Sequence, residues 1–184
     1  MNDMATLKQK FDKMTDGPLG YVIYAALGIM IAFLLNQGLA YALDTDLPVV
    51  AVISSSMTHD NTTPIVFYQW LENNMGYNES YINSWPVHNG FVIGDLPIIQ
   101  GEPKYNVGDV IVYSIPDQKV PIIHRIIKIN PDGTYMTKGD HNPTLLPFEG
   151  VVMPQQIHGK VIFIIPKLGY FKVIMTQIAG AQGS

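Results

Sequence analysis

The longest continuous apolar pattern of the chain lies near its N-terminus. From Leu19 to Leu35 no strongly polar residue occurs, and after two polar positions the apolar pattern resumes and continues to Leu43. At about 1.5 Å of rise per residue, a helix of this length can span the roughly 30 Å hydrocarbon layer with some tilt. The pattern predicts a transmembrane anchor over residues 19–43.

A cleaved secretory signal is the alternative for this segment, because Ala40-Tyr41-Ala42 has the small-x-small spacing of a cleavage site. The apolar core of a signal sequence is usually only about 7–15 residues long, so the length here favours a retained anchor. A later apolar stretch, 163–179, is interrupted by Pro166 and Lys167. We therefore expect a single span.

Beyond the anchor, short apolar runs are separated by turn residues. Dipeptides such as Gly108-Asp109 and Gly139-Asp140 divide the runs, as turns do. Short strands with frequent glycine and proline breaks are typical of an antiparallel sheet rather than of a doubly wound fold. We predict a mainly β fold, an antiparallel, barrel-like domain over residues 44–170, and a C-terminal tail, 171–184. The predicted strands are 48–53, 109–115, 120–129, 134–137 and 157–165.

A segment rich in aromatic residues and asparagine, 58–106, is expected to be inserted into the β domain. Thr63 before Pro64 has the pattern of an N-cap and a first helical residue, and Gly76 can end the helix. Four apolar residues of this helix share one face, which either packs on the β domain or enters the membrane interface; we favour packing. They are Phe67, Trp70, Leu71 and Met75.

Composition and charge restrict the classes of function. Hydrophobic residues make up 47% of the chain and charged residues 14%, which is typical of a folded chain rather than a disordered one. A net charge of −4 does not suit a nucleic-acid surface, so no nucleic-acid partner is expected. The chain has no cysteine, which excludes disulfides, thiolate metal sites and a cysteine nucleophile.

The distribution of charge predicts the orientation of the anchor. Lys8, Lys10 and Lys13 precede the span, whereas residues 17–103 contain no lysine or arginine. Because basic residues near a span favour the cytoplasmic side, residues 1–18 are expected in the cytoplasm and the β domain outside. Two Asn-x-Ser/Thr sequons suit that exterior placement, although such triplets are common by chance. They begin at Asn61 and Asn78.

Four separated segments resemble, in the correct order, the conserved boxes of type I signal peptidases. Ser54-Ser55-Ser56-Met57 resembles the Ser-x-Ser-Met box, and residues 108–113 resemble the Gly-Asp box that precedes a hydrophobic strand. His124-Arg125-Ile126-Ile127 resembles the box of the general base, and Lys138 to Asn142 resembles the Gly-Asp-x-Asn box. A histidine where most bacterial enzymes have lysine is typical of the archaeal and endoplasmic-reticulum type, the S26B-like serine proteases.

The resemblance implies a role for each matching residue. Ser56 corresponds to the nucleophile, His124 to the general base, and Asp140 to the carboxylate that supports catalysis by bonding the imidazole. Ser54 corresponds to the serine whose hydroxyl helps the backbone N–H of Ser56 to form the oxyanion hole. A turn aspartate and an ordinary loop serine are the alternatives for Asp140 and Ser54.

The chemistry of His124 can also be argued from its position. A serine hydroxyl becomes an effective nucleophile when a neighbouring base takes its proton, a step worth about 100- to 10,000-fold. On a strand, His124 shares its face with Ile122 and Ile126, and an apolar face keeps the imidazole neutral and able to accept a proton. An isolated histidine there would be read as a core residue. The serine box upstream favours the catalytic interpretation instead.

Two positions depart from the family pattern. The archaeal and endoplasmic-reticulum enzymes usually carry a second aspartate six residues after the first, and Leu146 stands there in this chain. Either Glu149 substitutes for it from a shifted loop, or Asp140 acts alone, or activity is impaired. The second departure is Thr58-His59, where the family commonly has x-Pro. His59 and Asp60 so near Ser56 suggest a rival triad, which the tight turn disfavours.

The resemblance implies a membrane-bound serine endopeptidase that removes signal peptides after small-x-small sites, without a metal or organic cofactor. Its expected partners are secretory preproteins, the lipid bilayer and the protein translocation machinery. The long insert favours a single-pass protein of an archaeal plasma membrane over a reticulum complex. The alternatives are a non-enzymatic, membrane-anchored β binding module, such as a degenerate peptidase, and a soluble self-cleaving repressor-type protease, which the anchor and His124 disfavour.

Overall fold

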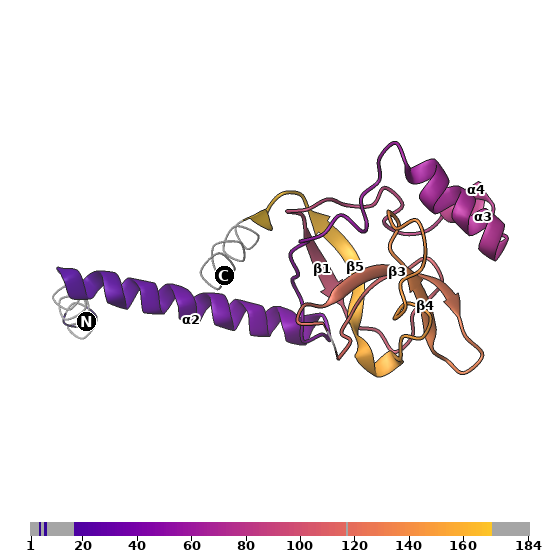
Figure 1. Cartoon of the computed structure of the whole chain (residues 1–184). Coiled ribbons are helices and arrows are strands. Elements are labelled where there is room, and N and C mark those ends of the chain that lie inside the picture. Colours follow the sequence, from indigo (N-terminus) through magenta and orange to yellow (C-terminus); the bar gives the residue numbers. More distant parts are fainter. Residues whose placement is uncertain (1–3, 5, 7–16, 117, 171–184) are drawn as a thin grey trace. The chain divides into compact units, whose positions relative to one another are not determined.

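The computed structural model describes residues 4, 6, 17–116 and 118–170 (Figure 1). The chain divides into two compact units, residues 1–42 and 43–184. Lys8, Lys10 and Lys13, on which the predicted orientation depends, lie outside the described residues, as do the tail 171–184 and the later part of the stretch 163–179.

The first unit contains the helix α2, Pro18–Ala42, which has 25 residues. It carries no charged residue, and it is the one helix among the described residues that is long and apolar enough to cross a membrane. Its bounds differ by one residue at each end from the span expected from the sequence. An α-helix of this length is about 37 Å long, which exceeds the thickness of the hydrocarbon layer.

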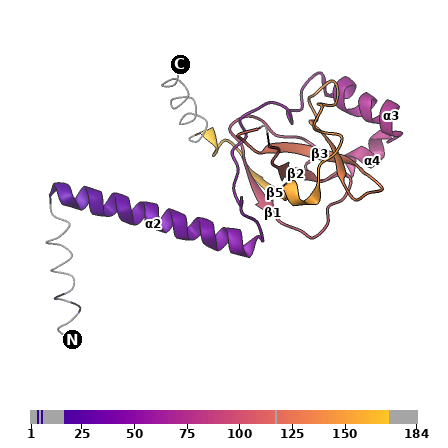
Figure 2. The same ribbon diagram turned by 60° about the horizontal axis from the view of Figure 1, so that its bottom comes forward.

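The second unit is built on a five-stranded antiparallel sheet (Figures 1 and 2). Its strands lie in the order β1-β5-β2-β3-β4. This arrangement confirms the mainly β, antiparallel class. The order does not close on itself, so the sheet is an open one rather than a complete barrel. The strands are β1, Leu96–Gln100; β2, Val110–Tyr113; β3, Ile122–Ile129; β4, Tyr135–Lys138; and β5, Ile157–Ile165.

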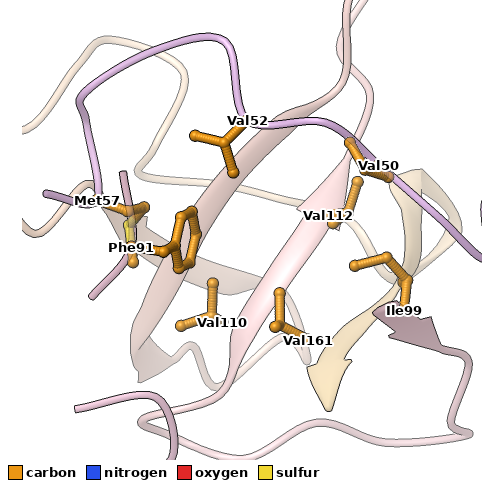
Figure 3. Close-up of a cluster of buried hydrophobic side chains, with 8 residues drawn as sticks. All are labelled: Val50, Val52, Met57, Phe91, Ile99, Val110, Val112 and Val161. Atoms are coloured by element: carbon orange, nitrogen blue, oxygen red, sulfur yellow. The ribbon is translucent and has the colours of Figure 1, made fainter. Parts of the chain in front are cut away.

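Apolar side chains cover both faces of the central strand β2. Val110 and Val112 point into one cluster, which Figure 3 shows, and Ile111 and Tyr113 point into a second cluster on the opposite face, as strand alternation requires. All four residues of β2 are buried. The first cluster also contains Val50, Val52, Met57, Phe91, Ile99 and Val161, and the second contains Tyr105, Ile126, Tyr135 and Val152.

The aromatic segment forms three short helices that pack on β3 and β4. They are η1, a π-helix over Pro64–Gln69; α3, Trp70–Met75; and α4, Glu79–Asn83. Gly76 ends α3 in the left-handed conformation with φ 72°, as predicted. Thr63 does not cap η1, since its hydroxyl accepts a hydrogen bond from the N–H of Asp60 instead.

The apolar stripe of these helices packs on the β domain, which was the favoured expectation. Phe67 and Leu71 form a buried cluster with Ile127 of β3, and Trp70 and Met75 pack against its edge. The same cluster contains Ile82 of α4 and Trp85. The helices are therefore fixed to the strand that carries His124. This connection becomes important for the site.

The sequence prediction was wrong for two segments. The predicted strand 48–53 makes only an isolated bridge, from Val49 to Ile98 of β1, although it runs beside β1 through bonds such as Val52 N–H to Asp95 O at 3.0 Å. Conversely, β1 lies inside the segment expected as an insert. A short 3-10 helix, η2, Pro154–Gln156, precedes β5.

Candidate active site

The serine run lies in a loop fixed to the core at both sides. Val52, before the run, and Met57, after it, are buried in the same cluster, so the serines are held at the surface between them. The N–H of Thr58 donates to the carbonyl of Ser55 at 3.0 Å, which closes a tight turn around Ser56. The hydroxyls of Ser54 and Ser56 are 3.2 Å apart and share a hydrogen bond.

His124 lies in the middle of β3, opposite Ile111 of β2. Its residue is 4% exposed, in agreement with the apolar face expected from strand alternation. The backbone of Gly139 lies against the ring, because a Cβ added there would be 2.9 Å from Nε2 of His124 and 2.6 Å from the amide nitrogen of Asn142. Glycine at position 139 therefore permits the close approach of the loop to the imidazole.

A cavity of about 470 Å³ brings the serine loop and His124 together. Ser54, Ser56 and His124 line it, and Asn142 adds another polar side chain. The rest of the wall is mainly apolar and comes from four segments. These lining residues are Leu47 and Val49 to Ile53, Phe91, Val120 to Ile123 with Gln118, and Leu146 with Phe148.

Glu149 is the carboxylate that contacts His124. Its Oε1 lies 2.5 Å from Nδ1 of the imidazole, and the side chains are 0% and 5% exposed, respectively. The Nδ1–H bond is not aligned with Oε1 as a regular hydrogen bond requires, so the contact is a close electrostatic one off the N–H axis. The N–H groups of Gly139 and Leu146 donate to the two carboxylate oxygens at 2.9 and 2.5 Å, which fixes the orientation of Glu149.

Asp140, by contrast, is bonded on the other side of the loop. Its fully buried carboxylate accepts bonds from Nη2 of Arg125 at 2.7 Å and from Nε2 of His59 at 2.9 Å. Burial alone would raise the pKa of Asp140, but the guanidinium charge and these bonds outweigh burial and hold the pKa below its usual value. Asp140 thus accepts hydrogen bonds from Arg125 and His59 instead of the expected hydrogen bond from His124.

Strand geometry explains this exchange of partners. His124 and Arg125 are successive residues of β3, so their side chains point to opposite faces of the sheet. Arg125 pairs with Lys138 of β4 in the register, and Asp140 follows two residues later on the same side. The buried guanidinium also donates to the backbone carbonyls of Pro86, Val87 and Gly108. Arg125 therefore joins the aromatic segment to the loop of Asp140.

The rival pairing of His59 with Asp60 is not formed. The bonding partner of His59 is Asp140, whereas Oδ1 of Asp60 accepts bonds from the N–H and the hydroxyl of Thr62. The ring of His59 also packs against Phe67, with ring centroids 5.2 Å apart. His59 thus connects the serine loop to Asp140 structurally.

The serine loop and the loop 139–142 are joined through their backbones. The N–H of His141 donates to the carbonyl of Ser56 at 2.8 Å, so the loop 139–142 supports the serine directly. Among residues 17–116 and 118–170, the hydroxyl of Ser56 is bonded to Ser54 rather than to His124. Such catalytic contacts are often open without substrate and close in the complex. The cavity holds a hydroxyl, an imidazole backed by a carboxylate, and space for a peptide, which are the requirements for acyl transfer.

Three residues of the site were not found from the sequence. Arg125 and Asn142 lie inside the matched boxes. Arg125 could have been found, because an arginine within a predicted buried strand requires a carboxylate partner. Phe148 carried no signal, since its position depends on the loop after Asp140. Within the part of the chain that the structure describes, no cluster of three or more histidine, aspartate or glutamate side chains is arranged to hold a metal.

Known proteins with similar sequences are named as catalytic subunits of a signal peptidase complex. The chain is 25% identical over 160 residues to the signal peptidase complex catalytic subunit SEC11 of Pyricularia oryzae, covering 83% of this chain and 77% of the relative. It is 31% identical over 128 residues to the corresponding protein of Schizosaccharomyces pombe, covering 67% and 61%. The chain belongs to the type I signal peptidases of the archaeal and endoplasmic-reticulum type. No family model matches it.

Membership in the type I signal peptidases explains the order of the four boxes along the chain. The match to the Pyricularia oryzae protein extends over most of both chains. The relatives found are eukaryotic proteins, so they do not support the narrower expectation of an archaeal source.

Proposed function

We propose that this protein is a membrane-bound serine endopeptidase that removes signal peptides from secretory preproteins. The observation that carries the proposal is the single cavity lined by Ser56 and His124, with Glu149 behind the imidazole. The relatives are named as catalytic subunits of a signal peptidase complex, which supports the same activity. The anchor α2 supports a position at a membrane.

In the proposed mechanism, the hydroxyl oxygen of Ser56 attacks the carbonyl carbon of the scissile peptide bond. Nε2 of His124 takes the serine proton during the attack and then gives it to the leaving amine. Water, activated by the same imidazole, hydrolyses the acyl-enzyme and regenerates Ser56. In this mechanism the backbone N–H of Ser56 and the hydroxyl of Ser54 stabilise the oxyanion.

We assign the third position of the triad to Glu149 rather than to Asp140. The negative charge of Glu149 beside Nδ1 favours the tautomer with the proton on that nitrogen, which leaves Nε2 free to accept a proton from serine. The negative charge of Glu149 also stabilises the imidazolium that forms during attack. Asp140 acts on the site indirectly, because it holds the loop 139–142 against Arg125 and His59.

The cavity suggests how a substrate binds. An extended peptide between the segment 47–54 and the first residues of β3 would direct alternate side chains toward the same wall. Two positions, immediately before the scissile bond and two residues further upstream, then face the cavity near His124, in agreement with the small-x-small rule expected for the family. The translocation machinery would deliver such a segment if the β domain lies outside the cytoplasm, as the lysines before the anchor favour.

The rival function is a binding module that has lost catalysis. It is favoured by Leu146, which stands where the family has its second aspartate. Glu149, three residues after Leu146, supplies a buried carboxylate at His124. The replacement of the family aspartate by Leu146 therefore leaves His124 with an acidic partner. This geometry favours the enzyme.

Cleavage of a preprotein by the purified protein in detergent tests the proposed function. Replacing a small residue immediately before the scissile bond by tyrosine is expected to reduce kcat/KM at least about 100-fold, because the larger side chain would meet the wall beside Ser56 and His124. The same replacement one residue further upstream directs tyrosine to the opposite side and serves as the matched control. Equal sensitivity at both positions would contradict extended binding.

Ser54 provides a second prediction within the site. Ser54→Ala removes the hydroxyl that lies 3.2 Å from Ser56, and we expect kcat to fall about 100- to 1,000-fold with little change in KM, because the oxyanion exists only after the attack. Steady-state kinetics on the preprotein measure both constants. A rise in KM at constant kcat would show instead that Ser54 binds substrate in the ground state.

A further inference from the structure

Lys138 is the last residue of β4 and one of the few charged side chains that the fold buries completely. The residue is 1% exposed. Its ammonium nitrogen donates to three backbone carbonyls, those of Val66 at 2.9 Å, Gly139 at 3.0 Å and Asn142 at 2.5 Å. An ammonium group has three N–H donors, so these acceptors use its full capacity. The same nitrogen lies 5.2 Å from the centroid of the Trp70 ring.

The three carbonyls belong to two separate parts of the site. Val66 lies in η1 of the aromatic segment, whereas Gly139 and Asn142 are the two ends of the loop beside the imidazole. Through Gly139 N–H this loop bonds Glu149, and through His141 N–H it bonds the carbonyl of Ser56. One ammonium group therefore connects the aromatic segment to the loop on which both the serine and the carboxylate depend.

Lys138 is not placed to react with a substrate. Bacterial relatives in the wider family use a lysine as general base, but Lys138 does not line the cavity shared by Ser56 and His124, and its N–H groups point to backbone oxygens. Its contacts suit a group that fixes the geometry of others.

We propose that Lys138 is a positioning residue, through which the aromatic segment holds the loop 139–142 in the geometry that Glu149 and Ser56 require for turnover. The proposal rests on the proposed peptidase function. It gives the segment that contains η1 and α3 a role in catalysis, namely to supply the carbonyl of Val66 as a fixed point and the ring of Trp70 as a cover for the ammonium group.

The charge of Lys138 makes this link sensitive to pH. Burial lowers the pKa of Lys138 to about 8, although the nearby carboxylates of Asp140 and Glu149 oppose the decrease. These two carboxylates and the ring of Trp70 are the charged and aromatic groups that face the ammonium from the adjoining loops and from α3. A neutral amine has only two N–H donors, so one of the three carbonyls loses its bond when Lys138 loses its proton.

Turnover and stability should then respond to pH in opposite directions. The pKa of lysine in the unfolded chain is near 10.5, above the value in the fold, so the unfolded chain keeps the proton longer. As the pH rises from about 8 toward 10.5, the contribution of Lys138 to stability therefore increases. The same deprotonation loosens the loop 139–142 and lowers kcat. A purely structural lysine would produce the change in stability alone.

The test compares the wild-type protein with Lys138→Met from pH 6 to pH 10. Methionine retains the packing against Trp70 but donates no hydrogen bond. For preprotein cleavage at pH 7 we expect kcat to fall at least about 10-fold with an unchanged KM. The wild-type kcat should decrease as the pH rises through 8, and this decrease should be absent in Lys138→Met. Above pH 8 the urea midpoint of the wild type should rise relative to that of Lys138→Met.

Lys160→Met is the matched control. Lys160 is a strand lysine that pairs with Glu102 at 2.9 Å, away from the cavity, and its loss should leave kcat and its pH dependence unchanged. The inference is overturned if Lys138→Met keeps the wild-type kcat and pH profile. It is also overturned if the wild-type kcat is constant between pH 7 and pH 9.5, and this second measurement does not depend on whether the variant folds. If Ser56→Ala abolishes cleavage while Lys138→Met does not affect it, the inference alone fails. If Ser56→Ala has no effect, the proposed function fails first.

Discussion

Ser56→Ala is expected to reduce kcat/KM for preprotein cleavage about 10⁴- to 10⁶-fold, to the level left by binding and oxyanion stabilisation alone. Alanine cannot form the acyl-enzyme, so the variant loses the covalent route rather than part of it. His124→Ala should cause a loss of the same order, because without a base the hydroxyl of Ser56 is a weak nucleophile. The double variant should be no less active than either single variant, since the two groups act in one step.

The serine run offers a matched control for this prediction. Ser55 is exposed between Ser54 and Ser56, and its carbonyl rather than its side chain closes the turn to Thr58. Ser55→Ala should therefore keep the wild-type rate. Thermal unfolding of each variant checks that His124→Ala, which leaves a space in a buried position, is still folded at the assay temperature. Undiminished cleavage by Ser56→Ala would remove Ser56 from the mechanism and favour the binding module.

The strands that were predicted from the sequence are those with strong local signals. β5 coincides with its predicted range, and β3 begins two residues later than expected, because both are rich in isoleucine and lie between turn residues. β1 was missed because Pro97 interrupts it, and proline in a short run usually argues against a strand. Its position at the edge of the sheet makes Pro97 acceptable, and that position is a property of the tertiary fold.

The candidate site was predictable where it follows a local motif and not where it depends on a loop. Ser56 and His124 line one cavity, as the serine box and the histidine box of the sequence predict. The partner of His124 is different. Glu149 turns back to the imidazole because its N–H bonds the carbonyl of Leu146 and its carboxylate bonds Gly139. Sequence spacing does not reveal a loop conformation held by such contacts.

Glu149→Gln is expected to lower kcat about 10³- to 10⁴-fold with little effect on KM. The amide has nearly the shape of the carboxylate, and its single oxygen can keep one of the two bonds, from Gly139 or from Leu146, but it carries no charge to stabilise the imidazolium of His124. An amide N–H facing Nδ1 would also favour the tautomer with the proton on Nε2, which cannot accept the proton of Ser56. Steady-state kinetics between pH 6 and pH 8 measure the effect.

Asp140→Asn separates the two carboxylates. Because Asp140 is bonded to Arg125 and His59, the loss of its charge leaves a buried guanidinium without a charged partner. We expect the free energy of unfolding, measured with urea, to fall by about 3–5 kcal/mol. The kcat of the folded fraction should change much less. If Asp140→Asn instead stays stable and loses turnover while Glu149→Gln remains active, the assignment of the third residue is reversed.

The family position can be used to test the same assignment by restoration. In Glu149→Ala the imidazole has lost its carboxylate, and adding Leu146→Asp places one at the position where the relatives of this type usually carry it. Leu146 lines the cavity beside His124, so a carboxylate there is within the same region of the site. We expect the kcat of the double variant to be at least about 10-fold higher than that of Glu149→Ala. Leu146→Asn in the same background is the control, because it matches the shape of aspartate without the charge and should restore nothing.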